Sequence, residues 1–316
     1  MGVSLLALAR YTLNGPYQAA AVVGVLAVMA VFIPPMLGNN LFAVLLGSIC
    51  MVLSCILVSL IILTQGTVSG LKAILVSMLG ITLVAWVLVN APSLGLWVGL
   101  VQWLPIIILS QSLRTTKSLA ITIMVGAALG AIAVGAQHLL IGPMQQELLN
   151  QAFLGIGESG QAAQELPQAT IELLRLLMLA MVAMVYLFIM LIVFSARWLQ
   201  ASLAGSKGFG EEFRALTLGR TAATVTVVLV GLGIWLQQDW MLSLVFILVF
   251  AFMFQGLAVV HSKFGPKRQG RLILTVFYTL LLLSKQAIAL TAVTGVIDNW
   301  LVFRKKPRKP NDENEL

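Results

Sequence analysis

From Tyr11 to Leu71 the chain contains no Asp, Glu, Lys, Arg or His. A typical soluble domain has about 25% charged residues, so a stretch of this kind does not suit a surface in water. The whole composition agrees, because 60% of the residues are hydrophobic, 9% are charged and the mean hydropathy is +1.02. Within lipid the backbone must satisfy its own polar groups, which an α-helix does. The solvent of this fold is therefore lipid.

Apolar runs between polar or charged residues predict the membrane-spanning helices, each of which needs about 20 apolar residues. Eight such runs cover residues 18–37, 41–63, 71–89, 94–109, 118–140, 173–196, 221–236 and 240–260. The sequence thus predicts an all-α integral membrane protein with about eight transmembrane helices. We expect residues 1–303 to form a single polytopic membrane domain, with lipid bilayer as its first partner.

The positions of the basic residues predict the orientation. All but two of the 19 Lys and Arg residues, namely all except Arg175 and Lys285, fall where they can lie on one side of the membrane. The positive-inside rule assigns that side to the cytoplasm. It places both termini there, together with loop 197–220 and a basic then acidic tail, 304–316, and it leaves loop 141–171 outside. The rule also accounts for the net charge of +8, so we expect no nucleic-acid partner.

The last apolar segment predicts a helical hairpin. Residues 272–303 are interrupted by Lys285 and followed by a basic cluster. A single crossing would place that cluster outside and Lys285 near the bilayer centre, at a cost of roughly 2.5–3.5 kcal/mol. A hairpin returning to the cytoplasm avoids both problems, and the single crossing is the alternative.

Polar side chains are costly within lipid, so they are the first candidates for function. A small-molecule pocket is predicted at the outer part of the fourth and fifth spans, beneath an amphipathic outer helix at 143–153. Its candidate residues are Trp97, Gln102, Trp103, Gln137 and His138. The alternative is that they mark the membrane interface and bond neighbouring helices. Small residues that allow close helix packing are Gly126, Gly130 and Gly256.

No sequence motif indicates an enzyme. The chain lacks an HExxH zinc motif, a phosphate-binding Gly-Lys-Ser loop and a GxSxG elbow. Cys50 and Cys55 lie in one apolar run, as small buried thiols do. We therefore expect no catalytic residue, metal or cofactor.

Three stretches resemble the YybS-like family of uncharacterised bacterial multi-pass membrane proteins. They are Gly208 to Arg220, Gln255 to His261 and Gly295 to Arg304. The resemblance implies the bacterial inner (cytoplasmic) membrane. The family is distantly similar to S components of energy-coupling-factor transporters, which implies a solute-binding or transport subunit. The partners so implied are a small-molecule solute and an ABC-type ATPase with its coupling subunit.

The alternative is a noncatalytic scaffold or assembly protein that works at the cytoplasmic face. The candidate residues of that docking surface are Glu211, Arg214, Arg220, Asp298 and Trp300. Asp298 lies close to the end of the last helix, and we expect it to meet an arginine of loop 214–220.

Overall fold

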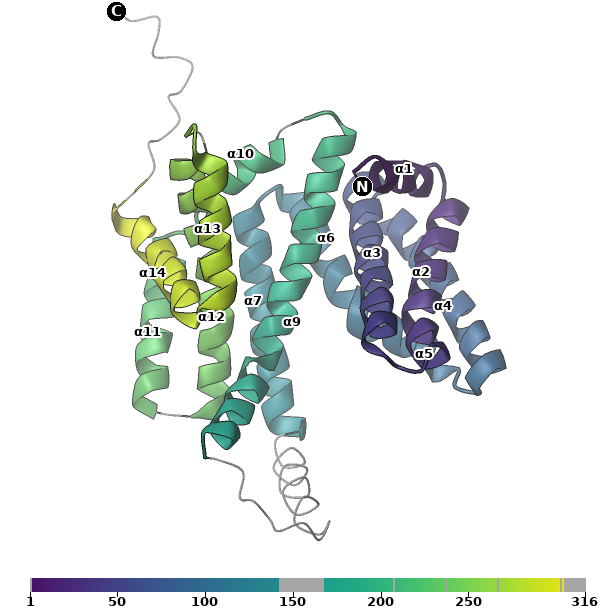
Figure 1. The fold of residues 1–316 in the computed structure, drawn as a ribbon, viewed down its shortest axis with the longest axis horizontal. Helices are drawn as coiled ribbons and strands as arrows, with labels where there is room; N and C mark the ends of the chain where they lie inside the picture. Colours follow the sequence, from purple (N-terminus) through teal and green to yellow (C-terminus); the bar gives the residue numbers. More distant parts are fainter. Residues whose placement is uncertain are drawn as a thin grey trace, which may run out of the picture. The chain divides into compact units, whose positions relative to one another are not determined.

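The computed structural model describes residues 2–141, 168–206, 208–236, 238–265, 267–301 and 303. Within these ranges every regular element is helical (Figure 1). The elements are α1 (Gly2–Leu13), α2 (Pro16–Met36), α3 (Leu41–Gln65), α4 (Thr67–Val89), α5 (Ser93–Trp97), η1 (Val98–Trp103), α6 (Leu104–Thr116), α7 (Leu119–Ala136), η2 (Gln137–Ile141), α9 (Gln168–Leu203), α10 (Gly208–Arg214), α11 (Arg220–Leu236), α12 (Asp239–Phe264), α13 (Gly270–Leu283) and α14 (Lys285–Leu301). The predicted all-α fold is confirmed.

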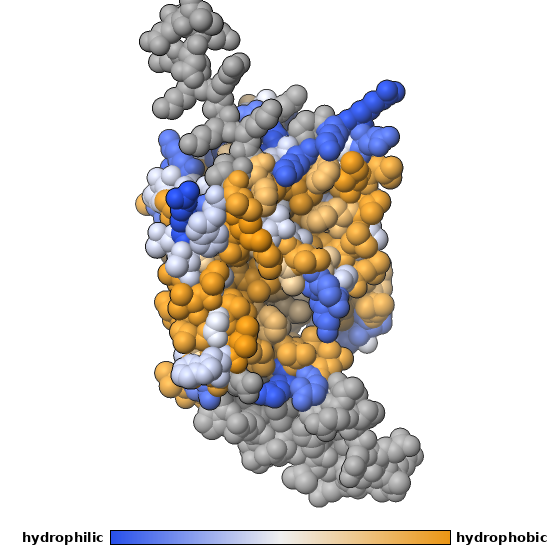
Figure 2. All heavy atoms as spheres, turned by 90° about the vertical axis from the view of Figure 1, so that its left-hand side faces the viewer, coloured by the Kyte–Doolittle hydropathy of each residue, from blue (hydrophilic) through white to orange (hydrophobic). Residues whose placement is uncertain are grey.

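Seven of the described helical segments are long and apolar enough to cross a membrane. They are Pro16–Met36, Leu41–Gln65, Thr67–Val89, Ser93–Thr116, Leu119–Leu140, Arg175–Leu203 and Asp239–Phe264. The remaining predicted span corresponds to α11, which has 17 residues and a length of about 25 Å. Hydrophobic side chains cover most of the middle of the face in Figure 2, and hydrophilic ones gather towards two opposite edges. This is a multi-pass membrane protein.

Asparagine and glycine residues set the ends of the early helices. Asn40 caps α3, because its side-chain oxygen accepts a hydrogen bond from the Ala43 N–H at 2.9 Å. Asn90 ends α4 in the left-handed conformation, with φ of 52°. Gly66, with φ of 101°, separates α3 from α4 and so allows a tight turn.

The chain divides into two compact units, which are described separately. Unit 1 comprises Met1–Leu129 and Val185–Glu212, and unit 2 comprises Gly130–Met184 and Phe213–Leu316. In unit 1, α2 packs against both α3 and α4. Serine hydroxyls of these helices donate to backbone carbonyls across the contact, Ser54 to Val23 at 3.2 Å and Ser77 to Ala20 at 3.0 Å. The expectation of a single membrane domain stays a prediction.

In unit 2, α12 lies directly against α14. The approach requires glycine on both helices. A Cβ atom at Gly256 of α12 would collide with the Thr291 carbonyl oxygen, and one at Gly295 of α14 would collide with the Phe252 carbonyl oxygen. Most of the residues of α12 that face this contact are buried, so α12 is the central helix of unit 2.

The segment after α12 is two helices with a sharp bend between them, an arrangement that fits either the predicted hairpin or a broken single span. Helices α13 and α14 meet at Ser284 with a bend of 116°. They contain 14 and 17 residues, which corresponds to about 21 Å and 25 Å, so neither spans the roughly 30 Å hydrocarbon core alone. The exposed Lys285 begins α14 at the tip. The tail 304–316 lies outside the described residues.

A hairpin returns the chain to the side from which it entered, so a reporter at the C-terminus should be cytoplasmic. We expect a C-terminal green fluorescent protein fusion to fluoresce and a C-terminal alkaline phosphatase fusion to be inactive. Phosphatase inserted after Gln238, between α11 and α12, is the matched control and should be active. An active phosphatase at the C-terminus would contradict the hairpin.

Candidate functional site

Three polar side chains of unit 2 are buried together where α12 meets the end of α14. They are Gln255, Asp298 and Asn299, with exposed fractions of 0%, 4% and 8%. The Gln255 amide donates to the Asp298 carboxylate at 3.1 Å. Its carbonyl oxygen accepts from the Leu218 backbone N–H at 2.9 Å. Gln255 therefore joins α12 to α14 and to the loop before α11.

Backbone groups complete this cluster. The Asn299 side-chain oxygen accepts from the Gly219 N–H at 3.0 Å, and Arg220 Nε donates to the Asn299 carbonyl at 3.2 Å. The other oxygen of Asp298 accepts from the Phe303 N–H at 3.1 Å. Gly219 has φ of 92°, a conformation that favours glycine. Residues from three separate stretches of the chain thus meet in one hydrogen-bond network, here called the α12–α14 network.

The predicted docking residues lie at or near this network. Asp298 is within it, while Arg220 and Trp300 are exposed at its edge. Arg220 reaches the carbonyl oxygen of Asn299, and the Asp298 carboxylate accepts from Gln255 and Phe303. Glu211 and Arg214 are exposed on α10, which contains the boundary between unit 1 and unit 2.

Aromatic contacts surround the same end of unit 2. His261 Nε2 lies 2.6 Å from the Tyr278 hydroxyl, so α12 and α13 are joined by a hydrogen bond. The Phe213 ring meets the His261 ring edge to face, with centroids 5.9 Å apart. Lys263 lies over the Phe303 ring, 4.9 Å from its centroid. These contacts hold the start of the hairpin and the end of the chain's described part against α12.

The predicted outer-pocket residues divide between the two units. In unit 1, Trp97 is 64% exposed, Gln102 is half-buried and Trp103 is fully buried. Gln102 and Trp103 lie in the π-helical segment η1. The buried indole nitrogen Nε1 of Trp103 has no hydrogen-bond partner among the described residues. Unpaired buried donors are costly, and π-helical turns are frequent at functional sites.

The other two pocket candidates lie in unit 2, in η2. Gln137 is half-buried, and His138 is exposed with its ring centroid 6.5 Å from that of Trp240. The outer helix predicted at 143–153 lies outside the described residues.

The predicted packing glycines of α7 face bulky side chains. Gly126 lies against the Tyr186 ring and the Met190 sulfur in unit 1, and Gly130 lies against Ile247 in unit 2. The Tyr186 hydroxyl donates to the Ile123 carbonyl at 3.2 Å. Gly256 is the α12 glycine that packs on α14.

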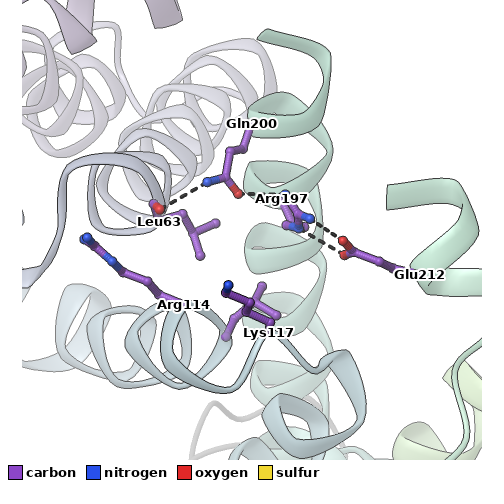
Figure 3. Close-up of a pocket in the computed structure, with 7 residues that line it drawn as sticks. Leu63, Arg114, Lys117, Arg197, Gln200 and Glu212 are labelled. Atoms are coloured by element: carbon purple, nitrogen blue, oxygen red, sulfur yellow. Dashed lines mark hydrogen bonds and ion pairs between the residues drawn. The ribbon is translucent and has the colours of Figure 1, made fainter. Parts of the chain in front are cut away.

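Unit 1 contains a cavity that sequence reasoning missed. Its volume is about 360 Å³, and Figure 3 shows residues that line it. The lining residues, here called the basic cavity, are Leu63, Leu113, Arg114, Lys117, Arg197, Gln200 and Glu212. The three cations come from the end of α6, its capping residue and the later part of α9. In the sequence these three cations were used only to predict the orientation in the membrane, and no motif indicated that they would line a common cavity.

Hydrogen bonds hold the walls of the basic cavity. Arg197 Nε donates to Glu212 at 3.0 Å in a two-point ion pair. Arg197 Nη1 donates to the Gln200 side-chain oxygen at 2.9 Å, and the Gln200 amide donates to the Leu63 carbonyl at 3.1 Å. Arg114 Nη1 donates to the Ile62 carbonyl at 2.9 Å. Arg114 and Gln200 therefore both bond carbonyls near the end of α3, where the Ile62 carbonyl also accepts from the Gly66 N–H at 3.1 Å.

Comparisons with protein-family models, curated proteins and solved structures found no significant match to this chain. The resemblance to the YybS-like family stays a prediction. The class that the fold defines is a helical multi-pass membrane protein, and its function must be argued from the site.

The α12–α14 network predicts a strong effect of Gln255→Leu. The variant removes the acceptor of the Leu218 N–H and one donor to the Asp298 carboxylate, and an unpaired buried group costs about 1–3 kcal/mol. We expect a clearly lower thermal midpoint in detergent, measured by intrinsic fluorescence. The control is Gln286→Leu, because Gln286 is an exposed glutamine near the hairpin tip. Equal midpoints for the two variants would contradict the role given to the network.

Proposed function

We propose that this protein is a noncatalytic docking protein of a bacterial cytoplasmic membrane, and that its working surface is the cytoplasmic end of unit 2. The observation that supports the proposal is the α12–α14 network, which joins three separate stretches of the chain. Buried polar groups within a membrane domain are costly and are therefore candidates for function. The network holds in place the backbone that carries Arg220 and Trp300.

The exposed residues around the network suit a protein partner with acidic side chains. Arg214 and Arg220 are exposed cations, and Trp300, which follows the Asn299 that Arg220 bonds, is 43% exposed. Tryptophan and arginine are the residue types most enriched among those that dominate binding energies at protein interfaces. Exposed cations also raise the rate at which an acidic partner associates. The proposed partner is an acidic cytoplasmic segment of another protein.

Site-specific crosslinking in living cells tests this function. With the photoreactive residue p-benzoylphenylalanine at position 300, we expect a discrete crosslinked product that contains a second protein. Trp235 is the matched control. It is an exposed tryptophan near the C-terminal end of α11, whereas Arg220 of the proposed surface begins that helix. Position 235 should give no such product, and Arg214→Glu should reduce the product at position 300 by roughly tenfold. No discrete product at position 300, or equal products at both positions, would contradict the proposal.

The unpaired indole N–H of Trp103 favours a second candidate function. In it the protein is a solute-binding subunit resembling S components, with an ABC-type ATPase and coupling subunit as partners. A buried donor without a protein partner suits a ligand that carries an acceptor, because the ligand would remove the cost of the unmade bond.

Trp103→Phe tests the second candidate, since it removes the N–H and keeps an aromatic ring. We expect a small molecule that copurifies with the wild-type protein in mild detergent, detected by mass spectrometry, to be lost from Trp103→Phe. Trp97→Phe is the control, because Trp97 is exposed on the same span. Equal retention in both variants, or no copurifying molecule in the wild type, would reject this candidate.

A further inference from the structure

We propose that the basic cavity of unit 1 is a binding site for a phosphate group at the cytoplasmic face. The inference is independent of the docking function, because it concerns a different unit and a different set of residues. It rests on three cations from two helical segments that line one cavity, together with the ion pair that one of them makes.

The charges of the basic cavity do not cancel. Glu212 pairs with Arg197. No carboxylate in the part of the chain that the structure describes pairs with Arg114 or Lys117. The cavity therefore has an excess of two positive charges. The positive-inside rule explains why these residues lie on the cytoplasmic side, but not why they line a shared space.

The donors of this cavity fit phosphate chemistry. Arg114 uses one N–H on the Ile62 carbonyl, and a guanidinium has five N–H donors. Lys117 adds an ammonium group with three donors, next to the end of α6. Arginine and lysine are the side chains that proteins use to bind phosphate, arginine through its planar fork and lysine as a point charge.

The size of the cavity indicates that the ligand is larger than a phosphate ion. Its 360 Å³ falls within the range of about 300–1,000 Å³ that small-molecule sites occupy. This leaves room for an organic group beside the phosphate. Two sources share that chemistry, a phospholipid headgroup of the inner leaflet and a soluble phosphorylated metabolite.

The ion pair between Glu212 and Arg197 predicts opposite changes in phosphate affinity for two substitutions. The Glu212 carboxylate forms an ion pair with the Arg197 guanidinium (Figure 3). It is therefore an internal anion at the position where we expect phosphate to bind. A bound phosphate competes with it for Arg197. Removing the negative charge at position 212 should therefore strengthen phosphate binding, whereas removing the positive charge at position 117 should weaken it.

The experiment uses the purified full-length protein in lipid nanodiscs and two probes. Calorimetry follows inorganic pyrophosphate in nanodiscs of phosphatidylcholine, and native mass spectrometry follows phosphatidylglycerol mixed with phosphatidylcholine. The first variant is Lys117→Asn, since asparagine tolerates the left-handed backbone at this position, where φ is 51°. The second is Glu212→Gln. The control is Lys72→Gln, because Lys72 is an exposed cation of unit 1 outside the cavity.

We expect at least one probe to bind saturably to the wild-type protein. Binding should weaken about tenfold in Lys117→Asn, in keeping with the loss of one charged hydrogen bond. It should tighten severalfold in Glu212→Gln and stay unchanged in Lys72→Gln. Pyrophosphate alone identifies a soluble source, and phosphatidylglycerol alone identifies a headgroup. Saturable binding of neither probe, or equal losses in Lys117→Asn and Lys72→Gln, would overturn the proposal. A gain in Glu212→Gln cannot arise from misfolding.

Discussion

The fold depends on one constraint, which is that a polar group removed from water must find a partner within the protein. In the apolar helices the backbone N–H and C=O groups find these partners in one another, through regular helical hydrogen bonds. The Gln255 side chain is fully buried in α12, and its hydrogen-bond partners come from outside that helix. It is bonded to Asp298 and to the Leu218 backbone. This one amide therefore joins α12 both to α14 and to the segment that precedes α11.

Much of the fold could be predicted because hydropathy and charge are local properties of the sequence. The spans and the break in the last apolar segment at Lys285 could be predicted from run lengths and the positions of the cations. The prediction fared less well at the ends of elements. The first span was expected at residues 18–37, whereas α2 begins at Pro16 and ends at Met36, with Pro34 and Pro35 inside its last turn. Short helices such as α1 and α10 were not predicted, because their pattern is weak and contacts with neighbouring helices stabilise them.

The candidate sites were harder to predict, because their partners are far apart in the chain. Asp298 could be singled out as a polar residue near a span, but its neighbour Gln255 lies 43 positions away. Two other members of the network are the backbone N–H groups of Leu218 and Gly219. Every residue but proline has such a group, so no residue type indicates which of them will serve. The basic cavity was missed for a related reason, since topology already explained its cations.

The two proposed sites differ in a way that decides what each can bind. In the α12–α14 network the side chains of Gln255, Asp298 and Asn299 are buried and bonded to one another and to the backbone, so these three residues hold a surface in place. Only the residues at its edge, such as the partly exposed Trp300, are open to a partner, and an open surface of this kind suits a protein. The basic cavity has the opposite character. Lys117 contributes an exposed ammonium group without a carboxylate partner, and the cavity encloses too little space for a folded chain. A small phosphate-bearing group supplies the negative charge that Lys117 lacks and is small enough for the cavity.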